Sequence, residues 1–105
     1  MTKSQHVRVV SLWIHPGQEG AFDAFERDAA RIIARHGGRI DSAVRLTPSR
    51  AAQDATPYEL HIVSFPDEAA ADSYANDPET LVLREKRGRI ISRTEVMTGQ
   101  PVGPY

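Results

Sequence analysis

Hydrophobic positions change from a strand-like to a helix-like spacing within the first third of the chain. Residues 7–14 (VRVVSLWI) are rich in β-branched and aromatic side chains and are short enough for a single strand. After a break at residues 15–17 (HPG), residues 18–36 place their apolar side chains on one helical stripe: Phe22, Phe25, Ala29, Ile32 and Ile33. This pattern predicts a strand followed by an amphipathic helix.

Two more strands are predicted in the middle of the chain. Gly37-Gly38 ends the helix, as glycines commonly do, and residues 39–47 then alternate with a period of two. Residues 48–57 contain two prolines among Ser, Arg, Gln and Asp, a composition typical of a loop. Residues 58–65 (YELHIVSF) again have the composition of a strand.

Helix start and stop signals follow the third strand. Residues 64–67 (SFPD) indicate a helix start, with their serine as a candidate N-cap and their acid three residues later. A break at residues 76–78 (NDP) restarts the helix, because Asp77 can cap it and Pro78 suits its first position. We expect this last helical piece to end at Gly88.

Residues 89–97 form the fourth predicted strand, which completes the order β-α-β-β-α-β. Two right-handed crossovers of this kind predict an α+β, ferredoxin-like fold, a four-stranded antiparallel sheet with its helices on one face. We expect one domain over residues 1–98 and an extended tail over residues 99–105, which holds two glycines and two prolines.

Alternation within the strands assigns side chains to the two faces of the sheet. The helix-facing side is predicted to carry Val9, Ser11 and Trp13 from the first strand, and Glu59, His61, Val63 and Phe65 from the third. The opposite side then holds Val10, Leu12 and Ile14 together with Leu60 and Ile62. A large exposed apolar face is uncommon in a monomer. We therefore expect a second copy of the chain to cover it, giving a homodimer.

The composition narrows the classes of function. The chain has 105 residues and a formal net charge of -1, which fits one folded domain without the basic excess that nucleic acids or anionic membranes attract. The absence of cysteine excludes disulfides, thiolate metal sites and a cysteine nucleophile. The polar start shows neither a signal peptide nor a membrane span, so a cytoplasmic location is expected.

His61 is the most informative candidate for chemistry. It lies in the middle of an otherwise apolar strand, where a histidine is costly to bury unless it is hydrogen-bonded. One interpretation is a structural histidine bonded to Glu59, Tyr74 or a backbone carbonyl. The other is a general base or ligand-orienting group in a pocket, because histidine as a residue type exchanges protons near neutral pH.

Several segments resemble the dimeric α/β-barrel superfamily, which holds antibiotic-biosynthesis monooxygenases, small polyketide cyclases, haem-degrading monooxygenases and uncharacterised stress-responsive proteins. They are a strand ending in Trp13 before the helix with Phe22 and Phe25, the strand-to-helix passage SFPDEAAADSY, and the break YANDPET leading into LREKRGRI. The resemblance covers most of the chain. It implies two sheets packed face to face as a barrel and a ligand pocket inside each subunit, between sheet and helices.

Tyr74 matches the tyrosine that small polyketide cyclases of this superfamily pair with a histidine six residues later. The sixth residue here is Thr80, which cannot act as a base at neutral pH, so the resemblance implies only half of that dyad. His61 is a candidate replacement from the facing strand. Alternatively, Tyr74 simply fills the gap between helix and sheet.

The resemblance also implies a wall for an aromatic or polyketide-like substrate. We expect His61 as proton acceptor and Tyr74 as hydrogen-bond donor, with substrate contacts from Ser11, Trp13, Phe22, Phe25, Glu59 and Leu83. Trp13 alternatively belongs to the core or the dimer contact. Arg84 is either a solvated helix residue or a ligand for a substrate carboxylate.

Other classes of site lack their signals in this sequence. The histidines show no metal-ligand spacing, no phosphate-binding glycine loop is present, and the aromatic motifs of RNA-recognition domains are missing. Asn76, the only asparagine, stands in a context unlike that of the haem-degrading enzymes. We expect no metal and no cofactor. Two hypotheses remain, a cofactor-independent monooxygenase or cyclase and a non-enzymatic dimeric binding or stress-response protein with a filled pocket.

Overall fold

The chain alternates strands and helices in the predicted order. The computed structural model describes residues 5–48 and 55–105. Its elements are β1 (His6–Ile14), α1 (Glu19–Arg35), β2 (Arg39–Arg45), β3 (Glu59–Phe65), α2 (Glu68–Ala75), α3 (Pro78–Ile90) and β4 (Ile91–Gly99). Most of the predicted loop over residues 48–57 lies outside the described residues.

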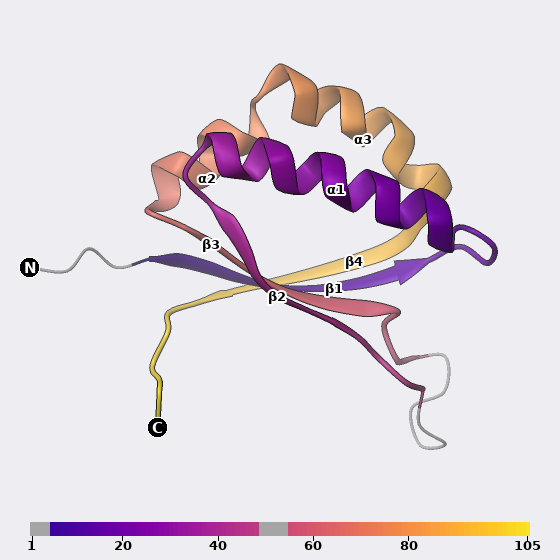
Figure 1. The fold of residues 1–105 in the computed structure, drawn as a ribbon, viewed down its shortest axis with the longest axis horizontal. Helices are drawn as coiled ribbons and strands as arrows, with labels where there is room; N and C mark the ends of the chain where they lie inside the picture. The colour runs from indigo at the N-terminus through magenta and orange to yellow at the C-terminus, as the bar shows by residue number, and fades with distance from the viewer. Residues whose placement is uncertain (1–4, 49–54) are drawn as a thin grey trace, which may run out of the picture.

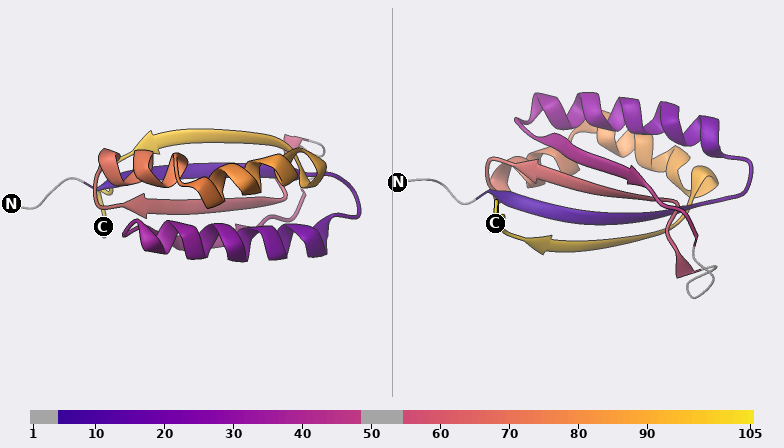
Figure 2. Two further views of the ribbon diagram at one scale, coloured as in Figure 1. Left: turned by 90° about the horizontal axis from the view of Figure 1, so that it is seen from above. Right: turned by 60° about the horizontal axis from the view of Figure 1, so that its bottom comes forward.

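The four strands form one antiparallel sheet in the order β2-β3-β1-β4. Within the described residues, the three helices lie together on one side of this sheet, and the other side has no helix over it (Figures 1 and 2). The arrangement confirms the ferredoxin-like fold class. We call the helix-covered side of the sheet the covered face and the other side the open face.

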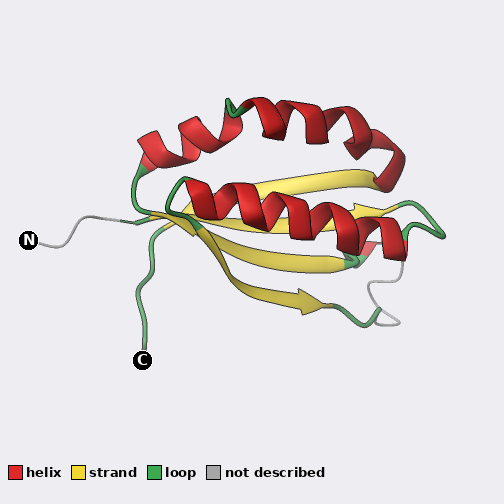
Figure 3. Cartoon of the chain, turned by 45° about the horizontal axis from the view of Figure 1, so that its top comes forward, coloured by secondary structure: helices red, strands yellow, loops and turns green. Residues whose placement is uncertain are grey.

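Short polar side chains start the two C-terminal helices, which Figure 3 shows separated by a brief loop. The Asp67 carboxylate accepts a hydrogen bond from the backbone N–H of Ala70, so Asp67 and not Ser64 is the N-cap of α2. Asp77 caps α3 ahead of Pro78, as predicted. The prediction that this helix ends at Gly88 is wrong, since α3 continues to Ile90.

The strand register corrects the predicted faces of β1. Val10 lies opposite His61, and Leu12 lies opposite Glu59, so these side chains share the covered face. Ser11 lies opposite Leu60 on the open face. The prediction for β3 is confirmed, whereas the set Val9, Ser11 and Trp13 was assigned to the wrong side, because β1 is apolar on both faces and its pattern fits either one.

The hydrophobic core lies between the covered face and the helices. Phe22 of α1 is fully buried against Leu12, Ile90 and Ile91. At the other end, Phe65 forms a cluster with Ile33, Val63 and Ala71. The turn from α1 to β2 depends on Gly38, where an added Cβ would come within 2.6 Å of the Phe65 ring. These contacts pack α1 against the covered face of the sheet.

The open face is largely apolar. Its side chains come from all four strands and include Val7, Val9, Ser11, Trp13, Val44, Leu60, Ile62 and Met97. Val44 is 47% exposed and Met97 is 62% exposed, while the residues on the central strands are mostly half-buried. Within residues 5–48 and 55–105, the helices are all too short or too polar to cross a membrane.

Candidate functional site

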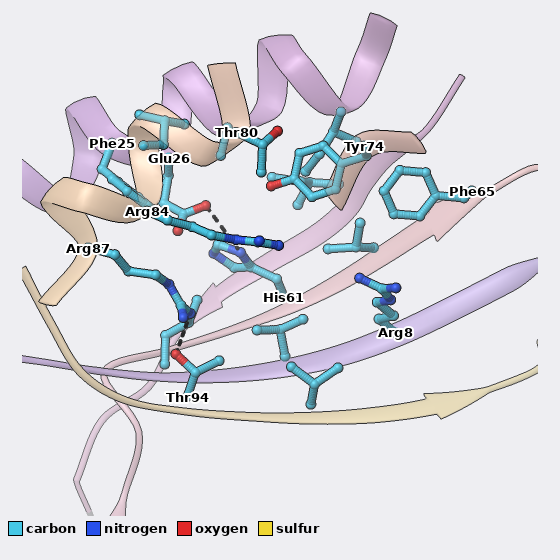
Figure 4. A pocket seen from close by; sticks show the side chains of 18 residues that line it. Arg8, Phe25, Glu26, His61, Phe65, Tyr74, Thr80, Arg84, Arg87 and Thr94 are labelled. Carbon is cyan, nitrogen blue, oxygen red and sulfur yellow. Dashed lines mark hydrogen bonds and ion pairs between the residues drawn. The ribbon is translucent and has the colours of Figure 1, made fainter. Parts of the chain in front are cut away.

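A cavity of about 470 Å³ lies between the covered face and the helices. This volume falls in the usual range for small-molecule sites, roughly 300–1,000 Å³. Much of its lining is apolar and comes from β1, α1, β3 and α3, including Val10, Leu12, Phe25, Ala29, Val63 and Leu83. Figure 4 shows polar side chains entering the same space from the sheet and from the helices.

His61 of β3 lies on the floor of the cavity and is only 3% exposed. Its Nε2 atom lies 2.5 Å from Oε2 of Glu59, the residue two positions earlier on the same face. The other carboxylate oxygen, Oε1, accepts hydrogen bonds from Nε and Nη2 of Arg45 at 3.1 and 2.9 Å. The histidine is therefore held by a carboxylate that is itself held by a guanidinium.

This chain of contacts determines which imidazole nitrogen is free. Because Oε1 of Glu59 accepts from Arg45, the contact with Oε2 assigns Nε2 of His61 as the donor to the carboxylate. Nδ1 is then the ring nitrogen that faces Glu26. The same contact with Glu59 is also the one expected if His61 is a structural histidine.

Glu26 of α1 approaches His61 from the helix layer. One carboxylate oxygen lies 3.7 Å from Nδ1 of His61, and the side chain lines the cavity. Burial raises the pKa of this carboxyl, Glu59 adds to the rise, and His61 and Arg87 oppose it. We did not predict Glu26 from the sequence. Its signal was an acid within the apolar stripe of α1, between Phe22 and Ala29.

Tyr74 of α2 projects its hydroxyl into the cavity (Figure 4). Its ring packs on Phe65 with the centroids 5.6 Å apart. The pKa of the phenol is raised, mainly by burial and also by Glu26, with the nearby arginines opposing the rise. The hydroxyl therefore keeps its proton at neutral pH and can donate it. Thr80 also lines the cavity, buried and without a hydrogen-bond partner within the described residues.

Three arginines complete the lining: Arg8 from β1, and Arg84 and Arg87 from α3. Arg8 donates through Nε to the His6 ring at 3.2 Å, and Arg87 donates to the Thr94 hydroxyl. Only Arg84 of these was a candidate from the sequence. Charged residues on β1 and on a helix end have the pattern of solvated positions, so their convergence on a cavity was not visible in the spacing.

The predicted site residues fall into three groups in the structure. His61, Tyr74, Phe25 and Leu83 line the cavity. Phe22 and Glu59 stand behind its wall, with the Phe22 ring centroid 6.3 Å from that of His61 and the Glu59 carboxylate bonded to its Nε2.

Ser11 and Trp13 lie on the open face and do not line the cavity. Their predicted role in substrate binding is corrected by the register of β1, in which successive side chains point to opposite faces. Trp13 is covered by Arg93 of β4, whose guanidinium carbon lies 4.5 Å from the ring centroid. This contact favours the alternative interpretation, in which Trp13 is a structural residue.

The residues of the site do not form a metal centre by geometry. In the part of the chain that the structure describes, no group of three or more histidine or acidic side chains is placed to hold a metal ion. His61, Glu59 and Glu26 instead form a linear series of contacts, which suits the holding and movement of protons.

Comparison with known proteins places the fold. No family model and no curated protein sequence matches the chain. A solved protein of unknown function from Rhodopseudomonas palustris is similar over 97% of this chain and 85% of its own, with a TM-score of 0.82 and 17% identity. A Bacteroides thetaiotaomicron protein named "Putative antibiotic biosynthesis monooxygenase" is similar over 99% and 95%, with a TM-score of 0.75 and 19% identity.

A third solved structure is described as a DABB family protein with a ferredoxin-like fold and comes from Mesorhizobium loti. It is similar over 95% of this chain and 99% of its own, with a TM-score of 0.70 and 16% identity. The structural neighbours therefore match the superfamily that the sequence resembles. At these identities the comparisons show that the chain shares the ferredoxin-like fold of monooxygenase-like and DABB proteins.

Proposed function

We propose that this chain forms a homodimeric α/β barrel in which each subunit binds an aromatic or polyketide-like small molecule and acts on it as a cofactor-independent monooxygenase or cyclase. The observation that carries the proposal is His61, buried on the floor of a cavity and held through Nε2 by the Glu59 carboxylate. A base oriented by a carboxylate is a common device for proton abstraction.

The cavity residues supply the parts that such a reaction needs. In the proposed mechanism, Nδ1 of His61 accepts a proton from the carbon or phenol of the substrate, with Glu26 3.7 Å away to share the charge. Tyr74 donates a hydrogen bond to the carbonyl or phenolate oxygen where negative charge develops. Phe25 and Leu83 contact the apolar body of the substrate. The resulting carbanion or phenolate either reacts with O₂, which leaves one oxygen atom as a new carbonyl and the other as water, or attacks a second carbonyl, whose oxygen takes the proton back from His61.

A second copy of the chain is proposed to cover the open face. The apolar residues there come from all four strands, and Met97 and Val44 are well exposed in the isolated chain. Single exposed apolar residues are ordinary, but a largely apolar sheet face, here with the Arg93–Glu95 ion pair on β4, marks an interaction surface. A two-fold arrangement would place Leu60 and Ile62 of one subunit against the same surface of its partner.

The competing hypothesis is a non-enzymatic dimer whose pocket is filled by side chains. A cavity of about 470 Å³ argues for an open pocket. Native mass spectrometry of the purified protein tests this first step. A dimer that carries extra mass supports the proposed binding function, whereas a monomer contradicts the proposed assembly.

Catalysis is tested with 1,8-dihydroxyanthrone, an aromatic phenol that reacts with one O₂ to give its quinone and one water. We expect oxygen uptake above the protein-free rate in the presence of a chelator. His61→Gln should lower the catalysed rate by about 100-fold, the usual scale for removal of a general base. Tyr74→Phe should lower it as well, with Tyr105→Phe in the exposed tail as the control. Equal rates for wild type and His61→Gln contradict the assignment.

A further inference from the structure

We infer that the cavity takes an organic anion, an aromatic acid whose carboxylate or equivalent group is bound by Arg84 and Arg87 of α3. The inference rests on the proposed function, because it concerns the same cavity, and it names the chemical class of the ligand. It is carried by the arginines that line the cavity and, among the described residues, form no ion pair with a carboxylate.

Most of the described arginines outside the cavity are paired with a carboxylate, and the cavity arginines are not. Arg31, Arg35, Arg39, Arg45 and Arg93 each form an ion pair with a carboxylate. Among the described residues, no carboxylate forms an ion pair with Arg8, Arg84 or Arg87. Arg87 donates to the neutral hydroxyl of Thr94, and Arg8 donates to the His6 ring. Among the described residues, the exposed Arg27 and Arg89 also form no ion pair. The cavity arginines are distinguished by the space that they share, in which their charge can meet another anion.

The positions of these arginines converge on one space. Arg84 and Arg87 are three residues apart on α3, so they lie on the same side of the helix. Figure 4 shows the Arg84 guanidinium extended into the cavity in front of His61, with Arg87 on one side of it and Arg8 on the other. Side chains from α3 and from β1 therefore reach the cavity from different walls.

The charge of the lining is positive. Glu26 is its only acidic residue, against three arginines. Burial also raises the pKa of Glu26, which weakens its negative charge further. A guanidinium presents its N–H groups in a planar fork that matches a carboxylate, and such a pair is stronger when partly removed from water. An anionic group is thus the ligand feature that this lining accommodates best.

The anion site also orients the ligand. Leu83 precedes Arg84 on α3 and packs with Ala29 and Ile32 in the core, so an apolar surface adjoins the charged one. A ligand with its acid group on α3 would place its aromatic body against Phe25 and its reactive carbon toward His61. The substrate class is therefore amphiphilic, with one acidic end and one aromatic end.

The test compares two fluorescent probes that differ in one sulfonate. These are 8-anilino-1-naphthalenesulfonate, which is anionic, and N-phenyl-1-naphthylamine, which is neutral; both fluoresce on leaving water. Wild type should bind the anion more tightly than the neutral probe. The variant R84Q/R87Q should weaken binding of the anionic probe by about tenfold or more, as expected for the loss of charged hydrogen bonds. Its affinity for the neutral probe should be unchanged.

The matched control is R27Q/R89Q, which removes the same charge from two exposed arginines outside the cavity. This control variant should bind both probes as tightly as wild type does. The anion site is wrong if the two double variants weaken binding of the anionic probe equally, or if neither weakens it. In both cases the cavity remains a binding site for the neutral probe. If neither probe binds to wild type, the proposed binding function fails together with it. The single variant R84Q is titrated with the same two probes. Unchanged binding of the neutral probe excludes a folding defect as the cause of weaker binding of the anionic probe.

Discussion

The two faces of the sheet are built from the same strands and carry different kinds of side chain. The covered face holds the titratable pair Glu59 and His61, both buried, and it meets a cavity. The open face holds Val9, Leu60 and Ile62, and its buried polar residues are serines. An apolar surface shows where another layer must pack, whereas titratable groups within an apolar surface show where chemistry is placed.

The largest expected effect concerns the packing of the covered face. Phe22→Ala removes a side chain with no exposed surface from the core that joins α1 to the sheet. We expect the free energy of unfolding to fall by about 3–5 kcal/mol. Urea denaturation measures it, with Val82→Ala on the exposed side of α3 as the control. A loss equal to that of the control would contradict the described packing.

The open face should respond through assembly and much less through folding. Ile62→Lys places a charge in the middle of this face, where a two-fold axis would bring two such charges together. We expect the dimer to dissociate at least about 100-fold more readily, because an unpaired charge is costly to bury. Sedimentation velocity measures the change. Val82→Lys, on the helix layer, should leave the dimer intact, and a dimeric Ile62→Lys would refute the assembly.

The helix layer should depend on pH through Asp77. The hydrogen bond from His36 lowers the pKa of this carboxyl to about 2, together with bonds from the Glu79 backbone and Arg35. Its ordinary value is 3.8, so its stabilisation is present above that pH and is lost as the pH falls through the folded value of about 2.

Asp77→Asn should therefore lower Tm by about 4 °C at pH 6, and the difference should be much smaller at pH 2. Circular dichroism melts at several pH values measure this effect. Asp72→Asn, in an exposed position of α2, should show no such dependence. A Tm difference for Asp77→Asn that is constant between pH 6 and pH 2 would rule out the ionic contribution.

The smallest expected effect has the opposite sign. Burial raises the pKa of Glu26, so the folded chain prefers its protonated form and is destabilised as the pH rises through the folded pKa. Glu26→Gln removes the ionisation, although it also removes the attraction of His61 and Arg87. We expect Tm to rise by roughly 1–3 °C at pH 8 and to approach that of wild type near pH 4. A lower Tm at pH 8 would show that the charge is well compensated.

The sequence could predict the faces of β3 but not those of β1. In β3, the polar residues Glu59 and His61 share one parity with Phe65, and the adjoining helix fixes which parity faces inward. In β1, the apolar residues occupy both parities, so a shift of one residue leaves the pattern equally good. Pairing with β3 determines which side chains of β1 face the helices. This pairing joins distant segments, so neither strand alone predicts it.

The candidate site was predictable where a residue broke its local pattern or matched the resembled superfamily. His61 was found because a histidine in an apolar strand is unusual, and Tyr74 because it matches the tyrosine of small polyketide cyclases. Arg87 was not, because an arginine near a helix end is ordinary until the fold brings it to a cavity. Glu26 is an intermediate case. The sequence predicted the apolar stripe of α1 on which it lies, but the acidic residue within that stripe was overlooked.

The order of strands has a consequence for the folding of a growing chain. Val10 of β1 pairs with His61 of β3 on one side and with Val96 of β4 on the other. β1 thus leaves the ribosome before either of its sheet neighbours, whereas β2 and β3, which pair with each other, follow one another in the chain. Non-local pairing of this kind slows folding. A stalled ribosome would expose β1 with both of its apolar faces, as a target for chaperones.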